Sequence, residues 1–94
     1  MNFIWDETKN KKLKAERNIS FDEVASLILH NNYVEIVKHP TRTEQKIFLV
    51  PIRGYIHAVP FVVDKEKNII LKTIFPSRKF NKLYGQKTQE DNTR

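Results

Sequence analysis

Several residues of this 94-residue chain have side chains that could act in acid–base or phosphate chemistry. His57 and Tyr84 could transfer a proton, and histidine is the side chain whose unperturbed pKa lies nearest neutrality. Arg78 could bind a phosphate, because it follows a strand pattern and opens a short amphipathic segment. Cleavage of a phosphodiester without a metal requires a base together with cations that hold the scissile phosphate. We therefore take Arg78, Lys46, His57 and Tyr84 as candidate catalytic residues.

Other cations could bind the backbone of a polyanion. The chain has 17 Lys and Arg against 11 Asp and Glu, a formal net charge of +6, and residues 71–88 contain no carboxylate. Such a charge attracts nucleic acid with an affinity that falls as salt rises, although a need for solubility also accounts for it. The candidate RNA-binding residues are Lys9, Arg53, Lys72, Lys79 and Lys82.

Each candidate also has a structural explanation that the sequence leaves open. Arg78 could be an ordinary surface arginine. Lys46 and Lys72 could protect strand edges against aggregation. His57, between two apolar residues of a strand, could be a half-buried packing residue, and Tyr84 could belong to the core.

Neither a metal nor a cofactor is expected. The three histidines are too scattered in the sequence to form a metal site, and the two glycines do not form a phosphate-binding loop. The chain has no cysteine, which fits a reducing compartment. No stretch approaches the roughly 20 apolar residues of a membrane span, and the N-terminus lacks a leader pattern. We expect a soluble, cytoplasmic protein.

Two helices are predicted in the first third of the chain. Asp6 is placed to cap a polar helix over residues 7–17, which few apolar side chains anchor. Ser20 and Glu23 form a capping box, flanked by the hydrophobic staple of Ile19 and Val24. The apolar stripe that follows predicts that the second helix packs on a sheet.

Four strands are predicted next, over residues 33–38, 46–53, 55–63 and 69–75. Their short connections favour an antiparallel meander. The strands over 46–53 and 55–63 each contain a proline, which cannot donate to a ladder and so indicates an edge or a bulge.

A short helix is predicted to close the domain. Ser77 can cap it, and Gly85 suits its end. Residues 86–94 contain no apolar side chain and are expected to be disordered. The prediction is one α+β domain over residues 1–85, with two N-terminal helices, a four-stranded, mainly antiparallel sheet and a short C-terminal helix, followed by a tail.

Two groups of motifs carry a family resemblance. The first is Phe3-x-Trp5-Asp6-x-x-Lys9, followed by Ile19-Ser20-Phe21-x-Glu23, and the second is the strand, Arg78-Lys79 turn and final helix. In this order they resemble the BrnT-type toxins of bacterial type II toxin–antitoxin pairs, a family with a RelE-like ribonuclease fold. Lys46 stands where that family usually has arginine, and lysine lacks the planar, two-pronged donor. Pro76-Ser77 replaces the family's Ser-Ala before Arg78.

The resemblance implies a function and partners. It implies a metal-independent endoribonuclease toxin that cleaves mRNA, with a cognate antitoxin that is usually a ribbon-helix-helix DNA-binding protein. An oligomer could form through the antitoxin. The alternative is a non-catalytic nucleic-acid- or protein-binding module on the same scaffold.

Overall fold

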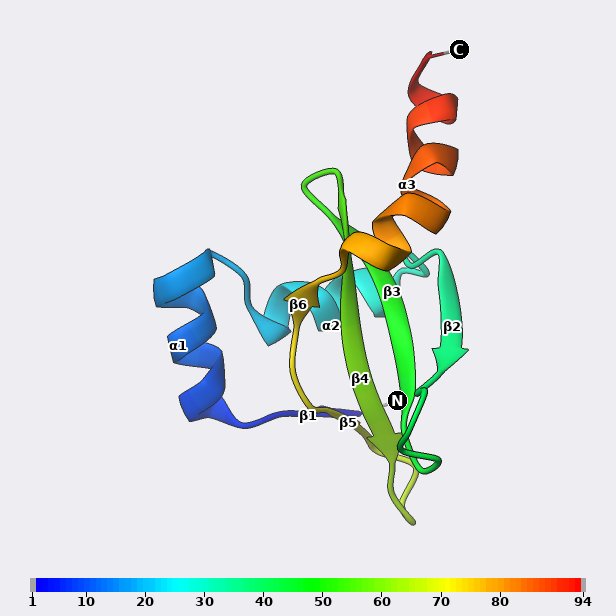
Figure 1. Cartoon of the computed structure of the whole chain (residues 1–94). Coiled ribbons are helices and arrows are strands. Elements are labelled where there is room, and N and C mark those ends of the chain that lie inside the picture. Colours follow the sequence, from blue (N-terminus) through cyan, green and yellow to red (C-terminus); the bar gives the residue numbers. More distant parts are fainter. Residues whose placement is uncertain (1, 94) are drawn as a thin grey trace.

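A mixed six-stranded sheet with helices on both of its faces forms the body of the protein (Figure 1). A computed structural model describes residues 2–93, with the side chains of residues 2–85. The elements in chain order are β1 (Phe3–Ile4), α1 (Glu7–Arg17), α2 (Phe21–Leu29), β2 (Glu35–Lys38), β3 (Lys46–Ile52), β4 (Tyr55–Val63), β5 (Ile69–Leu71), β6 (Phe75–Pro76) and α3 (Arg78–Thr93).

The strand order in the sheet is β1-β5-β4-β3-β2, and β6 pairs with β4. The α+β class and the mainly antiparallel pairing are confirmed. The predicted number of four strands is wrong, because β1 adds a short pairing parallel to β5 and the separate short strand β6 pairs with β4. The strand predicted over 69–75 is divided. Lys72 N still donates to Pro60 O, 2.8 Å away. After Lys72 the chain leaves the ladder, and Ile74 is buried in the core at 1% exposure.

Pro51 lies where β3 has no neighbour on one side, and Pro60 lies where the residue pairing of β4 with β5 ends. β3 and β4 pair without a bulge from Lys46↔Phe61 to Ile52↔Tyr55. Pro51 lies beyond the last residue pair between β2 and β3, and Pro60 lies between the parts of β4 that pair with β6 and with β5. Each missing N–H therefore falls at a gap in the ladder, which confirms the predicted edges.

The sheet separates two apolar clusters of unequal size. The larger cluster lies on the face covered by α2 and includes Phe21, Val24, Phe48 and Val59. The smaller cluster lies on the opposite face and consists of Ile47, Leu49, Ile56 and Ala58, with Val37, Phe80 and Tyr84 packed against it. The alternation of side chains along β3 and β4 produces this division. The α3 helix therefore covers one face, and α2 covers the other.

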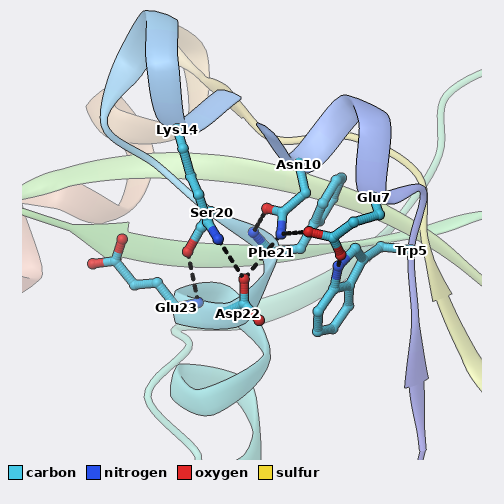
Figure 2. A network of polar contacts seen from close by, with 8 residues as sticks. All are labelled: Trp5, Glu7, Asn10, Lys14, Ser20, Phe21, Asp22 and Glu23. Atoms are coloured by element: carbon cyan, nitrogen blue, oxygen red, sulfur yellow. Dashed lines mark hydrogen bonds and ion pairs between the residues drawn. The ribbon is translucent and has the colours of Figure 1, made fainter. Parts of the chain in front are cut away.

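The polar helix α1 is attached through a buried asparagine (Figure 2). Asn10 is fully buried, and its Oδ1 accepts a hydrogen bond from Phe21 N, 2.8 Å away. Its Nδ2 donates to Asp22 Oδ2 at 2.9 Å and to Glu7 Oε1 at 3.2 Å. Asp6 caps α1 by accepting from two backbone amides, and Ser20 Oγ caps α2 by accepting from Glu23 N, as the sequence predicted. One amide group thus fixes the angle between α1 and α2.

The α3 helix is attached to the free edge of β4 by two hydrogen bonds. Ser77 N donates to Ile56 O at 3.0 Å, and Ile56 N donates to Asn81 Oδ1 at 3.1 Å. Ser77 Oγ accepts from Phe80 N, which confirms the predicted cap. These contacts hold the first turn of α3 over the sheet.

The last helix extends further than the sequence indicated. Gly85 does not have the positive φ of a helix end, and the backbone is helical to Thr93, where we expected a disordered tail over 86–94. A Cβ on Gly85 would lie 2.7 Å from Asn81 Oδ1, so this glycine leaves room for the docked asparagine. Arg94 lies outside the described residues, and the separation of a domain over 1–85 from a tail stays a prediction.

Candidate functional site

His57 lies in a surface hollow between the end of α1 and the β3–β4 hairpin. The hollow has a volume of about 490 Å³ and is lined by Arg17, Ile19, Ile52, Arg53, Tyr55, His57 and Pro76. We call it the His57 hollow. His57 shares the face of Val59 and Phe61 in β4, and the pairing with β6 places Pro76 beside it. A proton-transfer group thus lies next to two arginines.

The imidazole of His57 has a defined tautomer. Its Nδ1 lies 2.8 Å from Tyr55 O, and a carbonyl can only accept, so Nδ1 carries the hydrogen. In the described part of the chain no buried side-chain nitrogen or oxygen lacks a hydrogen-bond partner. Nε2 has no hydrogen bond among the described residues, so it is not fully buried, and the His57 side chain lines the hollow. Nε2 holds the lone pair that a base requires.

The surroundings of His57 favour its neutral form. The side chain is 6% exposed, and burial lowers its pKa below the ordinary value of 6.5, because a charged imidazolium is poorly solvated there. The positive charges of Arg53 and Arg17 act in the same direction, while the bond to Tyr55 O and the charge of Glu23 oppose them. His57 is therefore neutral at pH 7.

Arg53 has structural contacts as well as a place in the hollow. Its guanidinium binds Glu23, with Nη1 3.0 Å from Oε2, and also donates to Asn18 O. These bonds tie the β3–β4 hairpin to the start of α2. Arg53 has φ 49° and Gly54 φ 80°, which makes this a two-residue turn of the kind that suits hairpins. Part of the charge of Arg53 is compensated by Glu23.

Arg78 is exposed at the first position of α3. Among residues 2–85, the side chain of Arg78 has neither a hydrogen bond nor an ion pair. It follows Pro76, which lines the His57 hollow, by two residues, so the two Cα atoms are at most about 7 Å apart. Lys82 is four residues further along α3 and so shares its face, while Lys79 Nζ lies 5.5 Å from the ring centre of Phe80.

Tyr84 and Lys46 are separated from His57. Tyr84 packs with Phe80 on the smaller cluster, across the sheet from His57. Lys46 pairs with Phe61, four residues from His57 along β4, which corresponds to about 13 Å of strand. The structure therefore does not bring the four candidate catalytic residues together.

A second group of cations surrounds a hollow of about 320 Å³, which we call the Arg42 hollow. Lys9 Nζ donates to Lys72 O at 3.0 Å, which ties α1 to the segment after β5. Arg42 and His39 also line it. Nδ1 of His39 accepts from the backbone N of Thr41 and of Arg42, so a neutral His39 presents an Nε2–H donor.

Two structural findings concern metals and membranes. Among residues 2–85, no group of three or more His, Asp or Glu side chains is arranged to hold a metal ion. In the same part of the chain, no helix combines the length and the apolar character that crossing a bilayer requires.

Comparison with known proteins identifies the fold. No family model matches the chain, and no curated protein matches it. Among solved structures, the crystal structure of the Brucella abortus ribonuclease toxin BrnT matches with a TM-score of 0.60 and 19% sequence identity, over 82% of this chain and 96% of that one. The chain has a BrnT-like fold. The resemblance expected from the motifs is thereby confirmed for the architecture.

The BrnT-like fold brings together residues that the sequence did not single out. Arg17 and Tyr55 join His57, and Arg42 joins Lys9 and Lys72. Arg17 comes from the end of α1, whose attachment depends on Asn10. The order His39-Pro40-Thr41-Arg42 before β3 was a local signal for a turn that presents an arginine.

Proposed function

We propose that this protein is a metal-independent endoribonuclease that acts as the toxin of a toxin–antitoxin pair. The observation that carries the proposal is the His57 hollow, in which Nε2 of a neutral histidine opens beside Arg17 and Arg53. The BrnT-like fold supports it, since the matched structure is a ribonuclease toxin.

The proposed chemistry is an attack by the 2′-hydroxyl of RNA on the adjacent phosphorus. Nε2 of His57 takes the proton of the 2′-hydroxyl as the O2′–P bond forms. The negative charge that develops on the phosphate oxygens is stabilised by the guanidinium groups of Arg17 and Arg53. The P–O5′ bond then breaks, and the departing oxygen takes a proton from water or from the Tyr55 hydroxyl. The products are a 2′,3′-cyclic phosphate and a 5′-hydroxyl.

Arg78 has a place in the proposal as a further phosphate ligand. It is exposed, and it lies two residues after Pro76 at the start of α3. Backbone N–H groups of a first helical turn also favour an anion there. Lys79 and Lys82 extend this positive surface, whereas Lys46 and Tyr84 have no part in the cleavage step.

The proposed partner is a small antitoxin, of the ribbon-helix-helix DNA-binding kind that the sequence resemblance implies. With a net charge of +6 on the toxin, acidic residues of the antitoxin would complement its surface. Both proteins would act in the cytoplasm, where mRNA is the substrate, and an oligomer would form through the antitoxin.

A second candidate function is a binding module that holds RNA without cleaving it. The contacts of Arg53 with Glu23 and Asn18 favour it, because they leave less positive charge for a transition state. Lys46 in place of the arginine usual in the family also favours it.

Incubation of the purified protein with a defined mRNA, with and without EDTA and with and without ribosomes, tests the two functions. We expect fragments that end in 2′,3′-cyclic phosphate, and we expect Arg17→Gln to reduce the cleavage rate about 10- to 100-fold. Lys11→Gln, on the opposite side of the same helix, is the control and should cleave normally. Intact RNA under all four conditions, with RNA still bound, would leave the binding module as the function.

A further inference from the structure

Three hollows adjoin one another along one side of α1. The α1 hollow, of about 230 Å³, lies between this helix and the segment from Thr73 to Phe75. It shares Lys9, Thr73 and Phe75 with the Arg42 hollow. It shares Arg17 with the His57 hollow. The three hollows therefore lie next to one another in a row that ends at His57, and we call this row the depression.

The charge along this depression is almost entirely positive. Its cations are Lys9, Lys12, Arg17, Arg42, Arg53 and Lys72, and among the described residues that line it Glu16 is the only carboxylate. Lys9, Lys12 and Arg17 all line the α1 hollow, and Lys9 lies between the other two around the helix. A surface with one sign of charge attracts a polyanion.

Two exposed aromatic rings lie along the same depression. Phe75 is 40% exposed and lines both the Arg42 hollow and the α1 hollow. Tyr55 is 36% exposed and lines the His57 hollow. Alternation of cations with exposed aromatic rings is typical of surfaces on which the unpaired bases of a single strand stack.

We propose that single-stranded RNA lies along this basic track, from Arg42 and Lys72, past Phe75 and α1, to Arg17 beside His57. The proposal rests on the proposed nuclease function for the end of the path, but RNA binding by the track can be measured separately. Lys9 and Arg17 are eight residues apart, about 12 Å along a helix, which matches three or four stacked nucleotides at about 3.4 Å each. The two flanking hollows lengthen the site beyond that.

The test measures binding without cleavage. The probe is a fluorescent single-stranded RNA of about 12 nucleotides, made uncleavable by 2′-O-methyl groups, and anisotropy is followed over a range of salt concentrations. We expect Lys12→Gln, Arg42→Gln and Lys72→Gln each to weaken binding several-fold. Each should also reduce the slope of log affinity against log salt by about 0.7. Phe75→Leu should weaken binding about tenfold with an unchanged slope.

Matched controls separate the track from general attraction. Lys11→Gln makes the same charge change on the opposite side of α1, and Leu83→Ala removes an exposed apolar side chain from α3. Both should bind as the unaltered protein does. Equal weakening by Lys11→Gln and Lys12→Gln would overturn the track, as would equally tight binding of a duplex of the same sequence.

The outcomes for the track and for the nuclease differ. His57→Gln should bind the probe normally while losing cleavage of ordinary RNA. If the track variants bind normally and His57→Gln loses cleavage, the track is wrong and the nuclease stands. If the unaltered protein cleaves nothing and the track variants bind weakly, the track stands and the nuclease is wrong.

Discussion

The two faces of the sheet hold their helices in different ways. On one face, α2 buries Phe21 and Val24 completely, and α1 is attached through the fully buried Asn10. On the other face, α3 packs Phe80 and Tyr84 on four apolar residues and is attached to β4 through the half-buried Asn81. Each peripheral helix thus depends on one asparagine, but the amide of Asn10 makes three hydrogen bonds and is inaccessible to water.

The difference indicates which face can hold chemistry. A base must keep its position to within a fraction of an ångström, and on the face of α1 and α2 the ring of His57 is 6% exposed and held by its Nδ1–H bond to Tyr55 O. The face of α3 presents an apolar cluster covered by one helix. We therefore place the proposed base, His57, on the face of α1. The α3 helix contributes Arg78 to the proposed site.

The largest expected effect is a difference in RNA cleavage rate between substitutions on the two faces of the sheet. His57→Gln should lower the rate of RNA cleavage by about 10² to 10⁴, because the substitution removes the base. Tyr84→Phe, on the opposite face, should change the rate less than about threefold. Gel assays of a labelled RNA measure both. A larger loss for Tyr84→Phe than for His57→Gln would move the catalytic site to the face of α3.

Replacing Asn10 should reduce the free energy of unfolding more than replacing Asn81. Asn10→Ala leaves the buried N–H of Phe21 without its partner and should reduce the free energy of unfolding by about 2 to 3 kcal/mol. Asn81→Ala removes the single hydrogen bond that the half-buried Asn81 accepts from Ile56 N, one bond against three for Asn10, and should cost about 1 kcal/mol. Urea denaturation of the two variants gives both values. Equal losses would show that the two attachments do not differ.

The pH dependence of cleavage tests the state of His57. Because burial lowers its pKa, the rate should rise with pH to a plateau whose midpoint lies below 6.5. Arg53→Gln removes a charge that keeps the pKa low, so the midpoint should move upward. A midpoint above 6.5 in the unaltered protein would contradict the burial of the ring.

The same histidine links stability to pH. Its folded-state pKa lies below its unfolded value, so the unfolded chain binds the proton more readily. The free energy of unfolding should therefore fall as the pH drops through 6.5 toward the folded pKa. His57→Gln should lack this component.

The smallest effect concerns the contact between Gly85 and Asn81. Alanine in place of a helical glycine ordinarily stabilises by about 1 kcal/mol, but here its Cβ would lie 2.7 Å from Asn81 Oδ1. Gly85→Ala should gain nothing alone and should gain about 1 kcal/mol in the Asn81→Ala background. Thermal unfolding of the four proteins in this double-mutant cycle measures the coupling.

Much of the fold could be predicted from local chemistry. The caps at Asp6, Ser20 and Ser77 are formed, and the helix over 7–17 and the strand over 55–63 have the predicted bounds. The short strands β1 and β6 were missed, because a two-residue strand has no periodicity to detect. Their partners are far away in the sequence, as Phe3↔Ile69 shows.

The candidate site was predicted less completely. The chemistry of His57 and Arg78 could be read from their types, and Arg78 is exposed as expected. The pairing of Arg53 with Glu23 could not be foreseen, because it joins residues 30 positions apart. Lys46 and Tyr84 lie away from His57 for two different reasons: register places Lys46 on the same face but opposite Phe61, four residues along β4, and Tyr84 packs on the opposite face.

The sequence by itself determined the helix caps, the main strands, the positive charge and the set of groups able to act on a phosphate, because each depends on residue types and near neighbours. Only the tertiary structure decided that His57 opens beside Arg17 while Tyr84 packs across the sheet. The physical reason is that strand register and helix docking decide which side chains lie next to each other in a site. Register and docking depend on contacts between residues far apart in the sequence, such as that of Asn10 with Phe21.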